Sequence, residues 1–523
     1  MDIKLEDKYR LIKGTRFLTG AQALVRVPIV QARRDKRKNL NTACYISGYR
    51  GSPLGGYDQQ ILNNKKYLNE NNIFFQPGIN EELAATSLWG TQQVNLRKKD
   101  KYDGVFGIWY GKGPGVDRAG DALKHVNLAG TSKFGGVIAL MGDDHICESS
   151  TTSHQSEFAM IDAMIPFFNP SGVQEILDYG IIGIELSRKS GCWVGIKCVH
   201  DNVSSGATVD LDENRVELKN ISNESYPSNG LNIRLKDTAQ EKEYRLHHHK
   251  LKYVKEYCKL NNLNKLIFDS EKPRIGIIST GKSFLDTKLG LEKIGINKDV
   301  ARKIGIKFLK IAMPWPLEET VIEKFAENLE KIIVVEEKRS IIETQVKEIL
   351  FNKNLKVKVV GKKDENSNDL FVSSGALDPG EIGLNIYEII KYLQLPEDVN
   401  NFSKQLRSLT ESNNSNISLK RIPHFCSGCP HNTSTRIPKG SRAITGISCA
   451  YLVEHMERDN EGFSQMGSEG ATWVGESVFS NTDHVFQNMG DGTYIHSGIL
   501  SIRHAVAAKT KMTFKILYND AVA

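Results

Sequence analysis

Short, almost fully apolar runs that end in turns rich in glycine and aspartate are the feature that most restricts the fold of this 523-residue chain. Residues 136–141 form one such run, which ends at Gly142-Asp143-Asp144, and residues 193–199 form another. Runs without polar alternation are typical of strands that are buried on both faces, as in parallel sheets connected by helices. The first third of the chain is therefore expected to be a doubly wound α/β domain.

The length exceeds what one hydrophobic core normally serves, so several domains are expected. A polar stretch with a charged helical segment at 236–259 separates the first domain from a second α/β unit, whose strands are expected at 273–279 and 331–337. Residues 398–420 are rich in Asn and Ser and are expected to be a loop-rich linker. The expected divisions are residues 1–235, 236–270 (a helical linker), 271–395, 396–421 (a linker) and 422–523.

Charge and composition exclude several classes of protein. The net charge of +7 comes from 69 basic and 62 acidic residues spread along the chain, which gives little support to nucleic-acid binding. The N-terminus lacks the apolar core of a signal peptide, and no apolar run is long enough to span a bilayer. We therefore expect a cytoplasmic protein without a membrane partner, whose eight cysteines do not form a disulfide framework.

A magnesium site is predicted near the C-terminus. In Gly490-Asp491-Gly492 the glycines permit a tight turn after a strand, and Asp491 supplies an oxygen ligand of the kind that Mg²⁺ prefers. A helix at about 497–508 and a strand at 514–518 would then return Asn519 to the same edge of a parallel sheet. The chain ends soon after that strand, so we expect an incomplete, C-terminally truncated third domain.

Residues 490–498 resemble the thiamine diphosphate fingerprint, and in particular that of the indolepyruvate ferredoxin oxidoreductases, a branch of the 2-oxoacid:ferredoxin oxidoreductase superfamily. The resemblance covers essentially the whole chain as the N-terminal portion of the long fused form. It implies a pyrimidine-binding domain, then a transketolase C-terminal-like domain, then the start of a diphosphate-binding domain. The Mg²⁺ ligands it implies are Asp491, Asn519 and the backbone carbonyl of Ala521, and the cofactor contacts are Gly490, Asp491, Gly492, His496 and Asn519.

Three cysteines cluster ahead of this turn. Cys426 and Cys429 form a CxxC pair, and Cys449 follows in the same domain. A zinc ribbon would more naturally show a second CxxC pair, whereas a CxxC pair with distant cysteines is typical of cubane iron–sulfur clusters. Three ordinary thiols remain the alternative. The resemblance implies that these residues bind a [4Fe–4S] cluster, whose fourth ligand is not found in this chain.

Two residues of the first domain complete the predicted site. Thiamine enzymes need a carboxylate that protonates the aminopyrimidine ring, and the resemblance of Asn80-Glu81-Glu82 to a family segment nominates Glu81. Either Glu could instead simply favour a helix N-terminus. Ser52 aligns with a Thr that contacts the substrate carboxylate in the family, although Arg50 replaces a Pro of that segment.

Other patterns give weaker predictions. Residues 276–283 match the phosphate-binding P-loop pattern, but Gly276 falls inside an apolar run, which leaves too little loop to wrap a phosphate. The tract His247-His248-His249 lies in a charged helical stretch and is expected to be solvated surface. The segment that starts at Lys124 resembles a family segment, but a structural role is expected for it.

The resemblance implies a reaction. An aryl 2-oxoacid such as indolepyruvate would be oxidatively decarboxylated, with its acyl group transferred to coenzyme A and its electrons passed through iron–sulfur centres to ferredoxin, in a homodimer. Two alternatives remain. One is a non-redox thiamine diphosphate lyase or ligase, which would not need the cysteines, and the other is an inactive truncated fragment.

Overall fold

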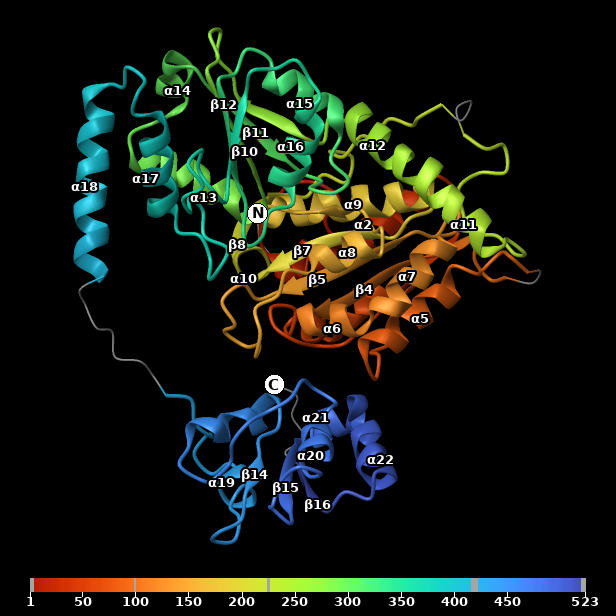
Figure 1. The fold of residues 1–523 in the computed structure, drawn as a ribbon. Helices are drawn as coiled ribbons and strands as arrows, with labels where there is room; N and C mark the ends of the chain where they lie inside the picture. The colour runs from red at the N-terminus through yellow and green to blue at the C-terminus, as the bar shows by residue number, and fades with distance from the viewer. Residues whose placement is uncertain (1–3, 98–99, 223–225, 415–421, 519–523) are drawn as a thin grey trace. The chain divides into compact units, whose positions relative to one another are not determined.

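The computed structural model describes residues 4–97, 100–222, 226–414 and 422–518. The chain divides into two units, residues 1–416 and 417–523, and each is described by itself. Unit 1 contains two largely parallel sheets with helices packed against them, and unit 2 contains a third parallel sheet (Figure 1). The α/β fold class expected from the sequence is therefore confirmed.

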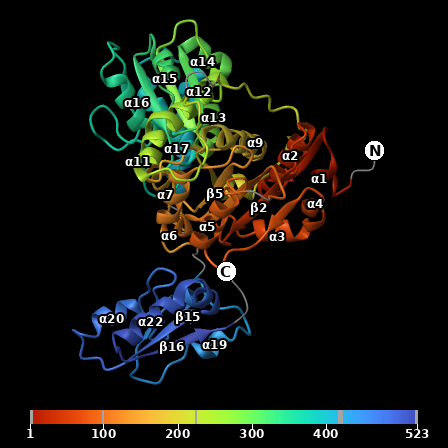
Figure 2. The same ribbon diagram turned by 90° about the vertical axis from the view of Figure 1, so that its right-hand side faces the viewer.

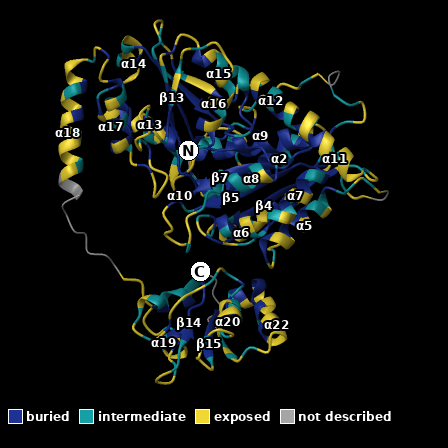
Figure 3. Ribbon diagram, viewed as in Figure 1, coloured by how far each residue is buried: buried dark blue, intermediate teal, exposed yellow. Residues whose placement is uncertain are grey.

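The first sheet of unit 1 has six parallel strands in the order β3-β2-β4-β5-β7-β6. Its strands are β2 (Thr42–Gly48), β3 (Ile73–Phe75), β4 (Gly104–Lys112), β5 (Val137–Asp143), β6 (Phe167–Phe168) and β7 (Val194–Val199). Every residue of β5 and β7 is buried, as their continuous apolar runs predict. In Figure 3 these strands are dark blue, and the yellow, exposed residues lie mainly on the helices outside them.

Helices cover both faces of this sheet. Helices α2 (Gly20–Arg37) and α9 (Val173–Ser190) pack together on one face, and α5 (Glu81–Thr91) and α7 (Gly120–Ala129) pack on the other. Shorter helices surround them, namely α1 (Asp7–Arg10), α3 (Tyr57–Asn63), α4 (Lys65–Asn69), α6 (Gly113–Arg118), α8 (Glu157–Asp162) and α10 (His200–Val203). Figure 2 shows α1, α2, α3 and α4 grouped beside β2. The arrangement is doubly wound, as expected.

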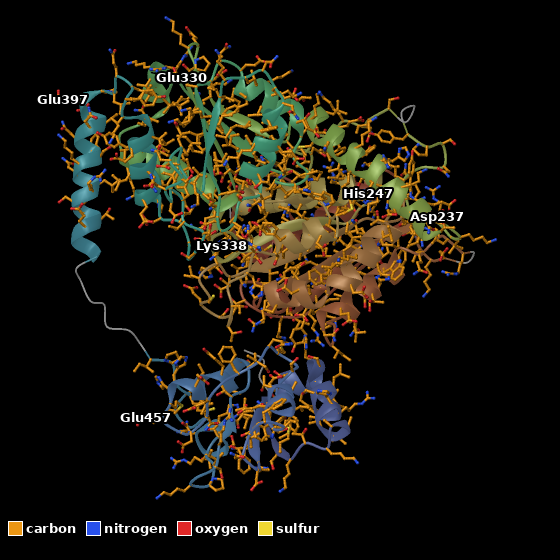
Figure 4. The ribbon with its side chains drawn as sticks, viewed as in Figure 1. Asp237, His247, Glu330, Lys338, Glu397 and Glu457 are labelled. Carbon is orange, nitrogen blue, oxygen red and sulfur yellow. The ribbon has the colours of Figure 1, made fainter. Side chains whose placement is uncertain are left out.

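Two additions border this domain. Strands β1 (Thr15–Thr19) and β8 (Gly206–Asp210) form an antiparallel pair. The charged helical stretch consists of α11 (Ala239–Arg245), the π-helix η2 (Leu246–Lys250) and α12 (Leu251–Leu260). His247, labelled in Figure 4, and His248 are exposed there, which confirms the solvated surface expected of the histidine tract.

The second sheet has five strands in the order β13-β12-β10-β11-β9, of which only the edge strand β9 is antiparallel. Its strands are β9 (Lys265–Phe268), β10 (Ile275–Thr280), β11 (Ile306–Ile311), β12 (Lys331–Val335) and β13 (Lys358–Val360), and its helices are α13 (Gly281–Lys293), α14 (Lys298–Ile304), α15 (Glu319–Ala326), α16 (Ile342–Phe351) and α17 (Pro379–Ile390). Gly276 lies within β10 and Lys282 binds Asp286 and Glu337, so the rejected P-loop is absent.

The linker expected at 398–420 is wrong for most of its length, because α18 spans Glu397–Asn414. Val399, Ser403 and Leu406 follow a helical spacing and pack toward the second core, on the side of α17. The many Asn and Ser residues of the segment obscured this apolar stripe in the sequence. Residues 415–420 lie outside the described residues. The other domain boundaries stay predictions, although β9 begins within the interval expected to be a helical linker.

Unit 2 is built on three parallel strands in the order β14-β15-β16 (Figure 1). The strands are β14 (Ala443–Ile444), β15 (Val485–Gly490) and β16 (Met512–Leu517), and the helices are α19 (His431–Ser434), the 3-10 helix η3 (Ser448–His455), α20 (Ala471–Glu476), α21 (Asp491–Thr493), the π-helix η4 (Tyr494–Gly498) and α22 (Ile499–Ala507). The strand expected at 514–518 and the helix expected at about 497–508 are both present, with shifted ends. None of the helices in the described part of the chain is long and apolar enough to cross a membrane.

Candidate active site

In unit 1 the predicted residues gather at the carboxyl edge of the first sheet. Because β2, β4 and β5 are parallel, their last residues Gly48, Lys112 and Asp143 lie at one edge. Loops at this edge of open α/β sheets are the usual place for ligands. A Cβ at Gly48 would lie 2.1 Å from the carbonyl oxygen of Tyr110, so only glycine allows β2 to leave the sheet so close to β4.

Glu81 is the first residue of α5 and is held in a fixed position. The Asn80 side chain caps the helix by accepting a hydrogen bond from the Leu83 N–H at 2.8 Å. The Glu81 carbonyl accepts a hydrogen bond from the Trp109 indole at 2.9 Å, and the residue is only 2% exposed, whereas Glu82 is exposed. The sequence alone could not distinguish the two carboxylates, but their burial does. The buried one is Glu81, the residue that the resemblance nominates.

Two glycines enclose the Glu81 carboxylate. A Cβ at Gly115 would lie 2.3 Å from Glu81 Oε1, and a Cβ at Gly111 would lie 3.2 Å from Glu81 Cγ. Any larger residue at Gly115 would displace the carboxylate or the turn that opens α6. The glycines therefore give this carboxylate a defined place at the sheet edge.

Lys112 is a site residue that the sequence analysis missed. Its side chain lies against Gly51, where an added Cβ would meet Lys112 Cδ at 2.5 Å. Burial lowers the pKa of the Lys112 ammonium, and the carboxylates of Glu81 and Asp144 oppose that shift. A half-buried cation between a glycine loop and a buried carboxylate suits the binding of an anionic group. The signal that could have found it is a lysine at the end of a strand, immediately before Gly113.

Ser52 is exposed in the loop that follows β2, next to Gly51 and so close to Lys112. Arg50 forms an ion pair with Asp58 at 3.6 Å within the same region. His154, which the sequence analysis did not single out, packs on Gly113 and pairs with Asp117 at 3.2 Å. Besides Glu81 and Lys112, this edge therefore carries two further pairs of opposite charge, whose carboxylates lie in α3 and α6.

In unit 2 the Gly490-Asp491-Gly492 segment forms the turn expected of it. Strand β15 ends at Gly490, α21 begins at Asp491, and the Gly492 N–H donates to Asp491 Oδ1 at 2.8 Å. Gly490 pairs with Leu517 at the end of β16, so the two strands finish at the same edge. The predicted ligands that follow β16 lie outside the described residues, namely Asn519 and Ala521, as does Asp520.

The CxxC segment lies near this turn. The Cys429 N–H donates to the Cys426 carbonyl at 3.0 Å, and His431, two residues later, is buried close to Asp491. Burial lowers the pKa of His431, and the negative charge of Asp491 opposes that shift. The fold thus joins two segments that lie far apart in the sequence, and His431 is a second residue that the sequence analysis missed.

The other predicted residues of unit 2 are less clearly arranged for binding. Cys426 is exposed, and Cys429 and Cys449 are half-buried. Within the described residues no three Cys, His, Asp or Glu side chains are grouped as metal ligands. His496 is 4% exposed, and its Nδ1 lies 2.7 Å from Ser497 Oγ.

Known proteins resemble this chain along its length. A family model described as the indolepyruvate oxidoreductase domain matches residues 265–416. Indolepyruvate oxidoreductase subunit IorA of Methanothermobacter marburgensis is 24% identical, over all of this chain and 78% of the relative. The protein of the same name in Pyrococcus abyssi is also 24% identical, over 86% of this chain and 68% of the relative.

The chain is therefore similar to the indolepyruvate oxidoreductases along its whole length. The names of these relatives support the oxidoreductase activity that the sequence led us to expect. The relatives are named as a subunit, so the fused form in particular stays a prediction. The family match falls on the second sheet and the helices after it, so the residues proposed for the site lie outside it.

A solved structure confirms the fold. It is titled 2-oxoglutarate:ferredoxin oxidoreductase from Magnetococcus marinus with 2-oxoglutarate, coenzyme A and succinyl-CoA bound, and it superposes with a TM-score of 0.52. The sequences are 13% identical, and the match covers 72% of this chain and 66% of the other. At that identity the likeness supports the architecture alone.

Proposed function

We propose that this chain is a thiamine diphosphate-dependent oxidoreductase that decarboxylates an aryl 2-oxoacid of the indolepyruvate type. Coenzyme A would accept the acyl group and ferredoxin the two electrons, in a homodimer. The buried Glu81 carboxylate, enclosed by glycines and Lys112 at the carboxyl edge of the first sheet, carries the proposal. The name of the family supports the aryl substrate.

The residues fit thiamine diphosphate and Mg²⁺. When bound, the cofactor supplies the nucleophilic carbon and the electron sink of the decarboxylation. The buried His431 Nδ1 lies near Asp491 and has no hydrogen-bond partner among the described residues, so it could bind a phosphate of the cofactor. We assign the Mg²⁺ ligands to Asp491, Asn519 and the Ala521 carbonyl, and cofactor contacts to Gly490, Gly492 and His496.

Glu81, Lys112 and Ser52 of unit 1 would act on the aminopyrimidine ring of the cofactor and on the substrate. The buried Glu81 carboxyl would hold the proton of the aminopyrimidine ring, because a carboxylate fixed by a helix cap and two glycines can donate and recover a proton in one geometry. The Lys112 ammonium and the Ser52 hydroxyl would bind the substrate carboxylate. In this assignment the positive charge of Lys112 pairs with the negative charge of the 2-oxoacid carboxylate.

Cys426, Cys429 and Cys449 fit an iron–sulfur cluster less well. Thiolates are the ligands that such clusters use. The described residues do not bring three of these side chains together, so we derive no step through a cluster. We keep the [4Fe–4S] assignment as a proposal that anaerobic iron and sulfide analysis tests directly.

Calorimetry and turnover together test the function. We expect the purified chain to bind thiamine diphosphate only with Mg²⁺, and indolepyruvate to be decarboxylated when coenzyme A and oxidised ferredoxin are both present. Asp491→Asn should weaken cofactor binding, because the ligand loses its charge. An absence of cofactor binding by the wild-type chain contradicts the proposal.

A non-redox thiamine diphosphate lyase is the second candidate, and the ungrouped cysteines are the observation that favours it. Decarboxylation without any need for an electron acceptor, by protein that contains no iron or sulfide, would establish this alternative. The variant Cys429→Ser would then leave turnover unchanged.

A further inference from the structure

Glu469 is a buried carboxyl of unit 2 that no part of the proposed function uses. It is 0% exposed and lies two residues before α20. Its Oε2 accepts a hydrogen bond from the Gly467 N–H at 2.7 Å, and no ion pair among the described residues includes it. A buried carboxyl without a cation is costly as an anion, and burial accordingly raises the pKa of Glu469 to about 7.

Three chain segments meet at this carboxyl. The Ile447 and Gly467 N–H groups and the Thr493 hydroxyl all act on it and lower its pKa against the effect of burial. Two of these segments also meet at Gly490, where an added Cβ would lie 3.8 Å from the Ile447 carbonyl oxygen and 4.0 Å from Thr493 Oγ1. The Glu469 carboxyl thus lies near the turn that carries Asp491 and near the segment that leads to Cys449.

The contact with Thr493 is incomplete in this state. Glu469 Oε1 and Thr493 Oγ1 are both buried, and neither makes a hydrogen bond of ordinary geometry with another described residue. A hydrogen bond between these two buried atoms would change the stability of the turn more than a hydrogen bond exposed to water would.

We propose that Glu469 is a positioning residue, which acts through Thr493 to set the Asp491 turn for the magnesium and diphosphate groups of the cofactor. The inference rests on the proposed function and adds a residue to it. Glu469 binds neither the metal nor the substrate. It holds the turn of α21 against the segments 446–449 and 467–470, so that Asp491 faces the ligand.

Two variants of each partner test the proposal. Glu469→Ala and Thr493→Val should each raise the dissociation constant of the Mg²⁺–thiamine diphosphate complex on the order of 10- to 100-fold, as loss of supporting contacts to metal ligands does. The double variant should be no weaker than the worse single variant, because both break one contact. Glu469→Gln and Thr493→Ser keep polar groups that can make this contact, so their dissociation constants should stay close to that of the wild type.

Hydrogen exchange of the cofactor-free full chain separates this inference from the proposed function. In Glu469→Ala, and in Thr493→Val should the first variant not fold, amides of 490–493 should exchange faster than in wild type, whereas the exposed control Glu461→Ala should leave them unchanged. Unchanged exchange in both variants overturns the positioning role, whatever the protein binds. If the variants exchange faster but the wild-type chain binds no cofactor, the positioning role stands and only the proposed function is overturned.

Discussion

Units 1 and 2 place their candidate functional residues in interiors of different chemistry. Around the first sheet of unit 1, apolar clusters fill both faces, and Glu81 lies at their edge in a pocket of glycines. The apolar cluster of unit 2 consists of Ile444, Trp473 and Val485. Unit 1 therefore has an extensive core of its own, which holds Glu81 in a defined position.

The interior of unit 2, by contrast, mixes polar and apolar side chains. Gln487 Oε1 and Asn488 Oδ1 are buried in β15 without a hydrogen-bond partner among the described residues. Large apolar side chains are instead exposed, among them Phe479, Ile495 and Val506. Unsatisfied polar groups and exposed apolar surface both reduce stability. We therefore infer that bound ligands and partners stabilise unit 2.

The largest effect should follow from removing the charge of Glu81 in unit 1. Glu81→Gln keeps the helix cap and the packing but cannot hold the proton, so turnover should fall about 1000-fold while cofactor affinity changes little. Glu82→Gln, at the next and exposed position of α5, is the matched control and should retain turnover. Equal losses in the two variants, measured by decarboxylation rates and calorimetry, would show that the pocket of unit 1 is not the site.

The interior of unit 1 also contains a buried lysine, Lys250, whose protonation can be tested. Lys250 of η2 is 0% exposed, and its Nζ donates to the Gly191 carbonyl at 3.1 Å, without any ion pair among the described residues. Burial lowers the pKa of Lys250 to about 8 from an ordinary 10.5. The unfolded chain therefore holds this proton more tightly than the folded chain.

Stability should consequently rise with pH between these two values. Between pH 8 and 10.5 the folded lysine becomes neutral while the unfolded lysine stays charged, so the wild type should gain up to about 3 kcal/mol relative to Lys250→Met. Chemical denaturation of both proteins near pH 7 and near pH 11 measures the gain. A difference that does not change with pH would mean that Lys250 keeps its proton in the folded chain.

Much of the framework could be predicted because it depends on local patterns. The continuous apolar runs at 136–141 and 193–199 became β5 and β7, and β15 ends at Gly490, where the turn was expected. The helix α18 escaped prediction because only Val399 and Leu406 mark its buried stripe among polar residues.

The residues that the sequence did not reveal acquire their place only through the fold. Lys112 matters because β4 ends beside the loop of Gly51, and Glu469 because three separate segments converge on it. Contacts between segments that lie far apart in the sequence cannot be read from periodicity or spacing. The pairing of Asp491 with Asn519 stays a prediction, because Asn519 lies outside the described residues.

A smaller effect should come from crowding the assembled pocket without changing its charge. In Gly115→Ala the new Cβ would lie 2.3 Å from Glu81 Oε1, so the carboxylate must shift, and a misplacement of this size costs about 100-fold in turnover. The matched control is Gly120→Ala at the start of α7, where no atom lies within 4 Å of the new Cβ. Normal turnover of Gly115→Ala would mean that the pocket of unit 1 is adaptable and not rigidly assembled.

The smallest effect tests the other side of the comparison, the dependence of unit 2 on its ligand. At ten times the dissociation constant, thiamine diphosphate with Mg²⁺ should stabilise the state that binds it by about 1.4 kcal/mol, which slows exchange about 10-fold. Amides of β15 and α21 should show this protection in hydrogen exchange, and amides of the second sheet in unit 1 should not. Asp491→Asn should abolish the protection at the same ligand concentration. Uniform protection of both units would mean that the ligand stabilises the whole chain and has no specific effect on unit 2.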